Sequence, residues 1–213
     1  MKRFSSVLAG VLTFGIAASA AAATFSLQDL VDGTVTSFQS DNGQLTFSDF
    51  DVTKLKKLSN NLELYTVTTV DDGFVLTSTE FTATTKGLKK LNLTYVVRAN
   101  ADALITGAEM EMAASRQSGR VKVEKDIEGI GNDDEGTFLL TLLRNGRSDL
   151  VDSDTFEPGS VAFEVEEAIR IKRVATLEFV RNSYSTNVPE APVLSLMLAG
   201  VAGLAAYGRR RSA

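Results

Sequence analysis

The chain has 213 residues, with 22 Lys and Arg against 27 Asp and Glu, and it contains no Cys, no His and no Trp. Without Cys there are no disulfides, thiol nucleophiles or thiolate metal sites, and without His there is no Ser-His-Asp triad and no imidazole base. The length suits a single domain, and the net charge of −5 argues against nucleic acid as a partner, because phosphate binding needs clustered cations. Composition alone therefore names no reaction.

The first 23 residues have the three parts of a secretory signal peptide. Lys2 and Arg3 form a basic start, the stretch 7–23 is apolar or small throughout, and an Ala-x-Ala exit precedes a polar run. The glycines and the terminal alanine run make this helix a poor permanent membrane anchor. We predict that signal peptidase cleaves after Ala23, with Ala20 as the alternative.

The segment 24–187 has the composition of a soluble acidic domain. Five of the 22 basic residues and one of the 27 acidic residues lie in the two end segments, so this middle segment carries a net charge of −9. Apolar and polar residues alternate in it, as at Leu91, Leu93, Tyr95 and Val97, which predicts half-buried strands. The strand pattern recurs at 44–52, 62–67, 74–82, 103–112, 121–127, 137–144, 161–166 and 174–181.

One of these ranges, 121–127, is rich in charge. We expect Val121, Val123 and Ile127 to point into the core and the charged residues to point mostly outward. Two other ranges, 53–61 and 164–171, are compatible with helical turns.

Turn signals separate the predicted strands at fairly regular spacing. Asp71-Asp72-Gly73 lies between two apolar runs and predicts a tight hairpin, and turn residues recur at 41–43, 86–87 and 145–146. Eight to ten short strands without long helical periods indicate a mainly β protein. We predict an antiparallel β-sandwich of jelly-roll-like type, preceded by the signal helix.

Acidic segments are the candidates for a ligand site. Asp133, Asp134 and Glu135 lie between two glycines, and Asp152 and Asp154 lie in a second acidic segment that we expect to be a loop. Calcium takes six to eight oxygen ligands, which such loops can supply, although neither segment has EF-hand spacing. These five residues are weak calcium candidates, solvated turns are the alternative reading, and no other cofactor is expected.

Catalysis has little support in the sequence. A glycan hydrolase would need two carboxylates facing each other across a cleft, and among 26 acidic residues some pair will always be found. We therefore expect the protein not to be an enzyme. Six lysines form two basic clusters that would meet acidic polysaccharide by charge complementarity, or else are solvated edge-strand residues: Lys54, Lys56, Lys57, Lys86, Lys89 and Lys90.

The C-terminal 26 residues form a third kind of segment. No residue in 191–208 is charged, and Arg209, Arg210 and Arg211 follow directly. Eighteen helical residues reach roughly 27 Å, close to the hydrocarbon thickness of a bilayer. We predict a transmembrane helix over about 191–208, with the arginines on the cytoplasmic side.

This arrangement resembles the PEP-CTERM sorting signal of Gram-negative bacteria, which joins a short Pro-Glu-Pro motif to a transmembrane helix and an Arg cluster. The motif residues are Val188, Pro189, Glu190 and Pro192, and Ala191 is an insertion relative to the usual Val-Pro-Glu-Pro. The segment 188–213 is therefore identified as a PEP-CTERM-like sorting signal, and the inserted alanine leaves the processing position near Pro189 open.

The resemblance implies a function for the whole chain. Signal peptidase and an exosortase would be its export partners, and the inner membrane would anchor it until processing. The mature domain would then join the cell surface, the outer membrane or the extracellular polysaccharide matrix, in a structural or adhesive role. Two alternatives stay open at this point: a calcium-dependent carbohydrate-binding module and, less favoured, a carboxylate-based glycan hydrolase.

Overall fold

The computed structural model describes residues 22–84, 87–100, 103–116, 118–130, 135–142 and 148–187. The sorting motif, the apolar segment 191–208, the Arg cluster and all of the signal peptide except its last two residues lie outside the described residues. Within the described ranges, no helix has both the length and the apolar character needed to cross a bilayer.

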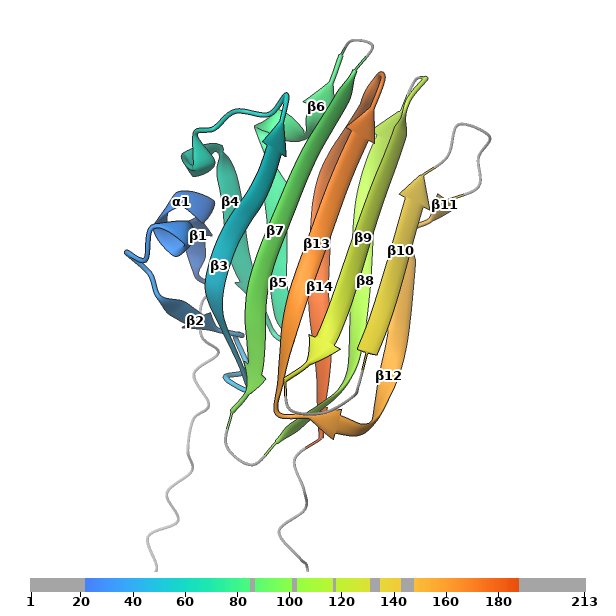
Figure 1. The fold of residues 1–213 in the computed structure, drawn as a ribbon. Helices are drawn as coiled ribbons and strands as arrows, with labels where there is room; N and C mark the ends of the chain where they lie inside the picture. Colours follow the sequence, from blue (N-terminus) through green and yellow to red (C-terminus); the bar gives the residue numbers. More distant parts are fainter. Residues whose placement is uncertain are drawn as a thin grey trace, which may run out of the picture.

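The described chain folds into two antiparallel sheets that pack face to face, the arrangement of a β-sandwich (Figure 1). The first sheet, sheet A, contains in spatial order β1 (Thr24–Ser26), β4 (Tyr65–Val70), β5 (Gly73–Ser78), β14 (Ala175–Asn187), β8 (Leu104–Arg116) and β12 (Val151–Ser160), with β6 (Thr82–Ala83) also paired to β14. The second, sheet B, contains β11 (Ser148–Asp149), β10 (Glu135–Leu142), β9 (Arg120–Gly129), β13 (Ala162–Lys172), β7 (Leu88–Ala99), β3 (Leu45–Lys56) and β2 (Ser37–Gln39). The mainly β, antiparallel prediction is confirmed.

The core lies between the two sheets and is built by the predicted alternation. Leu91, Leu93, Tyr95 and Val97 of β7 are all buried, while the residues between them face outward. Aromatic rings join the sheets: the Phe74 ring centroid lies 5.2 Å from that of Tyr95, in an edge-to-face arrangement. Inward-facing side chains such as these therefore hold the two sheets together.

Two predicted helical turns are wrong. The range 164–171 belongs to β13 and the first part of 53–61 to the end of β3. In β13 the residues Val165, Glu167 and Ile169 share the buried face, and a charged residue in the middle of that row hides the period of two. The helical elements are short: α1 (Leu27–Val31), whose N-terminus is capped by the Ser26 side chain, and the 3₁₀ turns η1 (Leu62–Leu64) and η2 (Thr79–Phe81).

The acidic segment containing Asp152 and Asp154 is also corrected, because it is a strand rather than a loop. β12 pairs with β8, placing Asp152 opposite Met110 and Asp154 opposite Ala108. β12 is the last strand of sheet A, and an edge strand tolerates charged residues that interrupt an apolar pattern.

The predicted Asp71-Asp72-Gly73 hairpin is confirmed. Val70 of β4 pairs with Gly73 of β5, so Asp71 and Asp72 make the turn. Gly73 is needed for close packing: a Cβ atom placed there would lie 1.7 Å from the backbone oxygen of Asn182 in β14. This hairpin therefore fixes how closely β5 approaches β14.

Candidate functional site

Five polar side chains are buried together between the two sheets. Lys125 of β9 and Glu167 of β13 are directly opposite each other in sheet B, and both are 0% exposed. Asn182 of β14 faces them from sheet A and is also 0% exposed. Tyr95 and Tyr184 complete the group, which we call the inner cluster.

The two tyrosines line the inner cluster and join the sheets. Their hydroxyl oxygens lie 2.8 Å apart in a buried hydrogen bond between β7 and β14. The Nζ atom of Lys125 lies 4.9 Å from the centroid of the Tyr184 ring, in a cation–π arrangement. Since Asn182 and Tyr184 are two residues apart on one strand, their side chains share the inward face, and Lys125 reaches that face.

Burial moves the proton affinities of the charged pair toward each other. Desolvation lowers the pKa of Lys125 to about 8, although the neighbouring Glu167 charge acts in the opposite direction. Desolvation likewise raises the pKa of Glu167, against the opposing influence of Lys125 and of the Asn182 amide. The low-dielectric core therefore disfavours the charged forms of both the amine and the acid.

Hydrogen bonding in the inner cluster is incomplete. Within the described part of the chain, neither carboxylate oxygen of Glu167 and neither polar atom of the Asn182 amide has a hydrogen-bond partner of ordinary geometry. Asn182 is nevertheless near enough to lower the pKa of Glu167. Buried polar groups are satisfied in the great majority of cases, so these four atoms need an explanation.

The sequence analysis did not identify Lys125, Glu167 or Asn182 as buried residues, although a signal was present for Lys125 and Glu167. Lys125 falls in phase with Val121, Val123 and Ile127, so the expectation that charges in 121–127 point mostly outward fails at this one residue. Glu167 is likewise in phase with the apolar residues of β13. A charged residue in phase with the apolar residues of an alternating strand is the sequence signal that predicts a buried charge.

The outer face of sheet B carries a second charged feature. The strand register aligns Lys56, Lys90, Arg170 and Lys122 in one row across β3, β7, β13 and β9. Flanking rows add further cations, and we call the full set the basic band: Lys54, Lys56, Lys90, Arg120, Lys122, Arg170 and Lys172. The other half of the same face is acidic, with Asp51, Asp126, Glu128, Glu164 and Glu166.

Charge interactions show that the band residues are close neighbours. Desolvation, together with the nearby charges of Arg170 and Lys54, lowers the pKa of Lys90. Arg170 and Lys122 both form salt bridges with Glu124, which lies at the boundary of the band. The lysines are therefore brought together from both predicted clusters. The edge-strand reading is wrong for Lys89 and Lys90, because β7 lies between β3 and β13.

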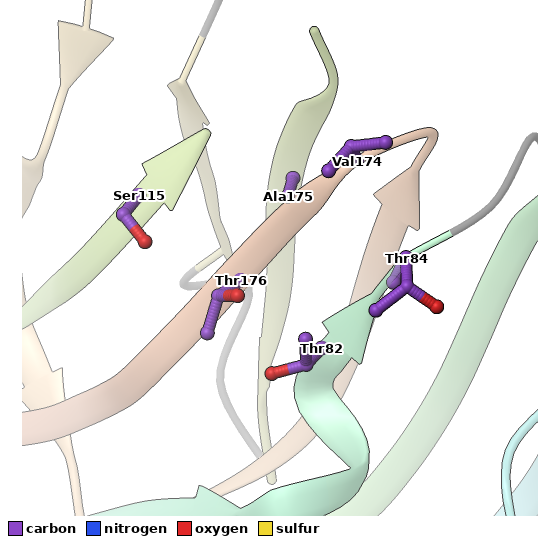
Figure 2. Close-up of a pocket in the computed structure, with 7 residues that line it drawn as sticks. Thr82, Thr84, Ser115, Val174, Ala175 and Thr176 are labelled. Carbon is purple, nitrogen blue, oxygen red and sulfur yellow. The ribbon is translucent and has the colours of Figure 1, made fainter. Parts of the chain in front are cut away.

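Two shallow hollows lie at the end of the sandwich where β6 meets β14. Figure 2 shows the first, of about 410 Å³, with Thr82, Thr84, Ser115 and Thr176 around it. Among the described residues, its lining contains hydroxyl and small apolar side chains and no ionisable group. The second, of about 800 Å³, includes Lys172 and Arg173 and continues the positive charge of the basic band.

Of the five calcium candidates, Glu135, Asp152 and Asp154 lie within the described residues, on strands β10 and β12. Asp133 and Asp134 lie outside the described residues, and Glu135 is the first residue of β10. Asp154 lines a shallow hollow with Glu109, and Asp152 is two residues away on β12. Across the described ranges, no group of three or more acidic side chains has the proximity needed to hold a metal ion.

Of the predicted processing residues, Ala23 lies within the described chain. Its backbone N–H donates to the Thr69 hydroxyl at 2.8 Å, and its carbonyl accepts from the Thr69 N–H at 2.9 Å. Ala23 therefore extends the pairing of β1 with β4. Val188, Pro189, Glu190, Pro192 and the Arg cluster lie outside the described residues.

No protein-family model matches the chain, and no curated protein matches it.

Proposed function

We propose that the protein is exported, sorted to the cell surface or extracellular matrix, and serves there as a structural or adhesive component that binds acidic polysaccharide. The observation that carries this proposal is the basic band. An overall acidic domain gathers seven cations on one half of one sheet face. Such a concentration of one sign of charge attracts a polyanion by complementarity.

The geometry of the band suits an extended ligand. Neighbouring strands lie about 4.8 Å apart, so the row from Lys56 to Lys122 across four strands extends for about 15 Å. The face is a sheet surface rather than a deep cleft, which favours a chain lying across the strands over a small molecule held in a pocket. The hollow beside Lys172 and Arg173 extends the positive surface.

Export and sorting rest on the two end segments. The signal peptide pattern of residues 1–23 and the PEP-CTERM-like tail 188–213 together support inner-membrane anchoring followed by exosortase processing. The proposal includes a transmembrane helix over 191–208. It also includes a jelly-roll-like order of strands in the sandwich. This strand order is supported by the connections that cross from one sheet to the other, which are β7 to β8, β8 to β9, β12 to β13 and β13 to β14.

The position of Ala23 refines the first processing step. Cleavage after Ala23 would remove the two hydrogen bonds that the Ala23 backbone makes with the hydroxyl and the N–H of Thr69, whereas cleavage after Ala20 would keep them. The fold therefore favours the earlier of the two predicted sites. Sequencing the N-terminus of the mature protein distinguishes them.

Binding is tested with polygalacturonate as an acidic polysaccharide and dextran as a neutral one. The variant Lys90→Gln/Arg170→Gln removes two central charges of the basic band, and we expect at least a tenfold loss of affinity for polygalacturonate. The matched control is Arg98→Gln, an exposed cation on the same face of β7 but in its acidic half. Equal loss in the control, or salt-independent binding, would show that the band is not the binding surface.

Sorting is tested separately by the intact mass of protein released from the cell surface. A mass that ends near Pro189 supports processing of the tail. A mature protein that still contains 194–207 would replace processing with a permanent membrane anchor.

A further inference from the structure

We infer that Lys125 and Asn182 are the reactants of an intramolecular transamidation that joins sheet B to sheet A through a side-chain amide bond, with Glu167 as the proton carrier. The basis is the juxtaposition of an amine, a carboxamide and a carboxyl group, all 0% exposed, in the middle of the sandwich. This inference is independent of the proposed polysaccharide binding, because the inner cluster and the basic band use opposite faces of sheet B.

The three groups come from strands whose register holds them together. Lys125 and Glu167 are paired residues on β9 and β13, so their side chains leave the sheet side by side. The ammonium of Lys125 lies over the ring of Tyr184, next to Asn182 on the inward face of β14. The close contact at Gly73 fixes the backbone of Asn182 itself.

The surroundings favour an uncharged reacting pair. A primary amine attacks an amide carbon only when it has lost its proton, and the Lys125 amine is enclosed where a charge is costly. Transfer of one proton from the Lys125 ammonium to the Glu167 carboxylate creates a neutral nucleophile and a neutral acid at once. The directions in which burial moves both pKa values agree with this transfer.

The reaction then balances without any further reagent. The Lys125 nitrogen forms a bond to Cγ of Asn182 while the Glu167 acid protonates the carboxamide. The bond from Cγ to the original amide nitrogen breaks and ammonia leaves. Glu167 retrieves the proton that the attacking nitrogen loses, so the products are one secondary amide, one ammonia molecule and the protonated Glu167 side chain.

The product also accounts for the unsatisfied atoms. An amide between Lys125 and Asn182 replaces a buried ammonium and a buried primary amide by one N–H and one carbonyl, which the Glu167 acid can bond. A protein with no Cys would thereby gain a covalent link between its sheets, across 57 residues of chain. Such a link suits a protein that is exported and lacks disulfides.

Mass spectrometry of the purified protein expressed from its full-length gene tests the bond directly. We expect the intact mass to fall below the sequence mass of the processed chain by one ammonia, about 17 Da. Trypsin cuts after Arg181 and leaves Asn182 as a peptide N-terminus, while the modified Lys125 resists cleavage. The expected product is a branched peptide that joins the tryptic segment 123–144 to the one beginning at Asn182.

Three variants separate chemistry from folding. Glu167→Gln keeps both reactants but removes the acid, and Asn182→Ala removes the acceptor, so both should lose the mass change and the branched peptide. Lys122→Gln, at an outward-facing lysine on the same strand, should retain the mass change and a branched peptide, which then begins at Val121 because residue 122 is no longer a tryptic site. An unmodified mass in the native protein, together with free tryptic cleavage at Lys125, would overturn the inference. Full cross-linking in Glu167→Gln would remove Glu167 from the mechanism.

Discussion

Strands β9 and β13 carry charged side chains on both of their faces. Similar residues are partly exposed on the outer face and fully buried on the inner face. On the outer face, Arg170 and Lys122 pair with Glu124, with side chains 22–34% exposed. On the inner face, Lys125 and Glu167 are 0% exposed. Water screens the outer charges and cannot reach the inner ones, so burial rather than residue type decides which charges are costly.

The largest expected effect comes from removing one member of the inner pair. Lys125→Met removes the proposed cross-link and also leaves the Glu167 carboxyl in the core without its partner, so we expect a loss of at least about 3–5 kcal/mol in the free energy of unfolding. Urea denaturation of the purified variant measures it. The matched outer change, Lys122→Met, should cost at most about 1 kcal/mol.

A second substitution tests how much of this loss comes from the Glu167 carboxyl, which Lys125→Met leaves buried without its partner. Lys125→Met/Glu167→Leu removes both polar groups from the core, and it should recover about 1–4 kcal/mol relative to the single variant. If the double variant is no more stable than Lys125→Met, the inner pair does not behave as a coupled buried pair and the contrast with the outer face fails.

The tyrosine pair tests the neutral part of the inner cluster. Tyr95→Phe removes one partner of the 2.8 Å hydroxyl contact and leaves the Tyr184 hydroxyl buried without it. We expect a loss of about 1–3 kcal/mol, because an unsatisfied buried group loses its hydration. Tyr95→Phe/Tyr184→Phe should be closer to the native stability, and thermal unfolding of the three proteins checks the order.

The pH dependence of stability depends on whether Lys125 still has an amine. In Asn182→Ala no cross-link can form, and we expect Lys125 to keep its pKa of about 8 against 10.5 in the unfolded chain. Between pH 8 and 9 the unfolded state then binds more protons than the folded state. Stability should therefore rise with pH in this window, by about 1 kcal/mol.

The other groups in the cluster set the limits of that window. Tyr95 and Tyr184 stay protonated in the folded state, since burial raises the pKa of both, and they oppose the rise as pH approaches 10. Glu167 has a raised pKa and contributes a fall in stability above pH 4.5. The rise should vanish in Lys125→Met/Asn182→Ala, and it should be absent from the cross-linked native protein. A rise of equal size in all three would exclude Lys125 as its source.

The same contrast explains what the sequence could predict. Alternation identified the strands whose buried rows are apolar, such as β7, because one face follows the period of two without interruption. It identified the first part of β13, at 161–166, but failed beyond it, where Glu167 occupies a buried position, and it failed at β12, where Asp152 and Asp154 lie on a sheet edge. Both failures occur where a charged residue departs from the simple rule of apolar inside and polar outside.

The sites were less predictable than the strands. The approach of Asn182 to Lys125 depends on how two sheets pack, and no local pattern in the 56 residues between them reports it. The basic band similarly depends on register: Lys56 and Lys90 are adjacent only because β3 and β7 pair at that residue. Two small lysine clusters were visible in the sequence, but the Arg170 and Lys122 contributions were not.

The smallest expected effect lies on the outer face, and it makes the binding test interpretable. Arg170→Gln breaks the salt bridge to Glu124 but leaves both side chains in contact with water, so we expect a loss of at most about 1 kcal/mol that shrinks with added salt. Urea denaturation at low and high salt measures it. A loss of unfolding free energy as large as that of Lys125→Met would mean that the outer salt bridge also contributes strongly to stability. With a small loss, weaker polygalacturonate binding by Lys90→Gln/Arg170→Gln reports the missing charges of the basic band, because the sheet that presents them is still folded.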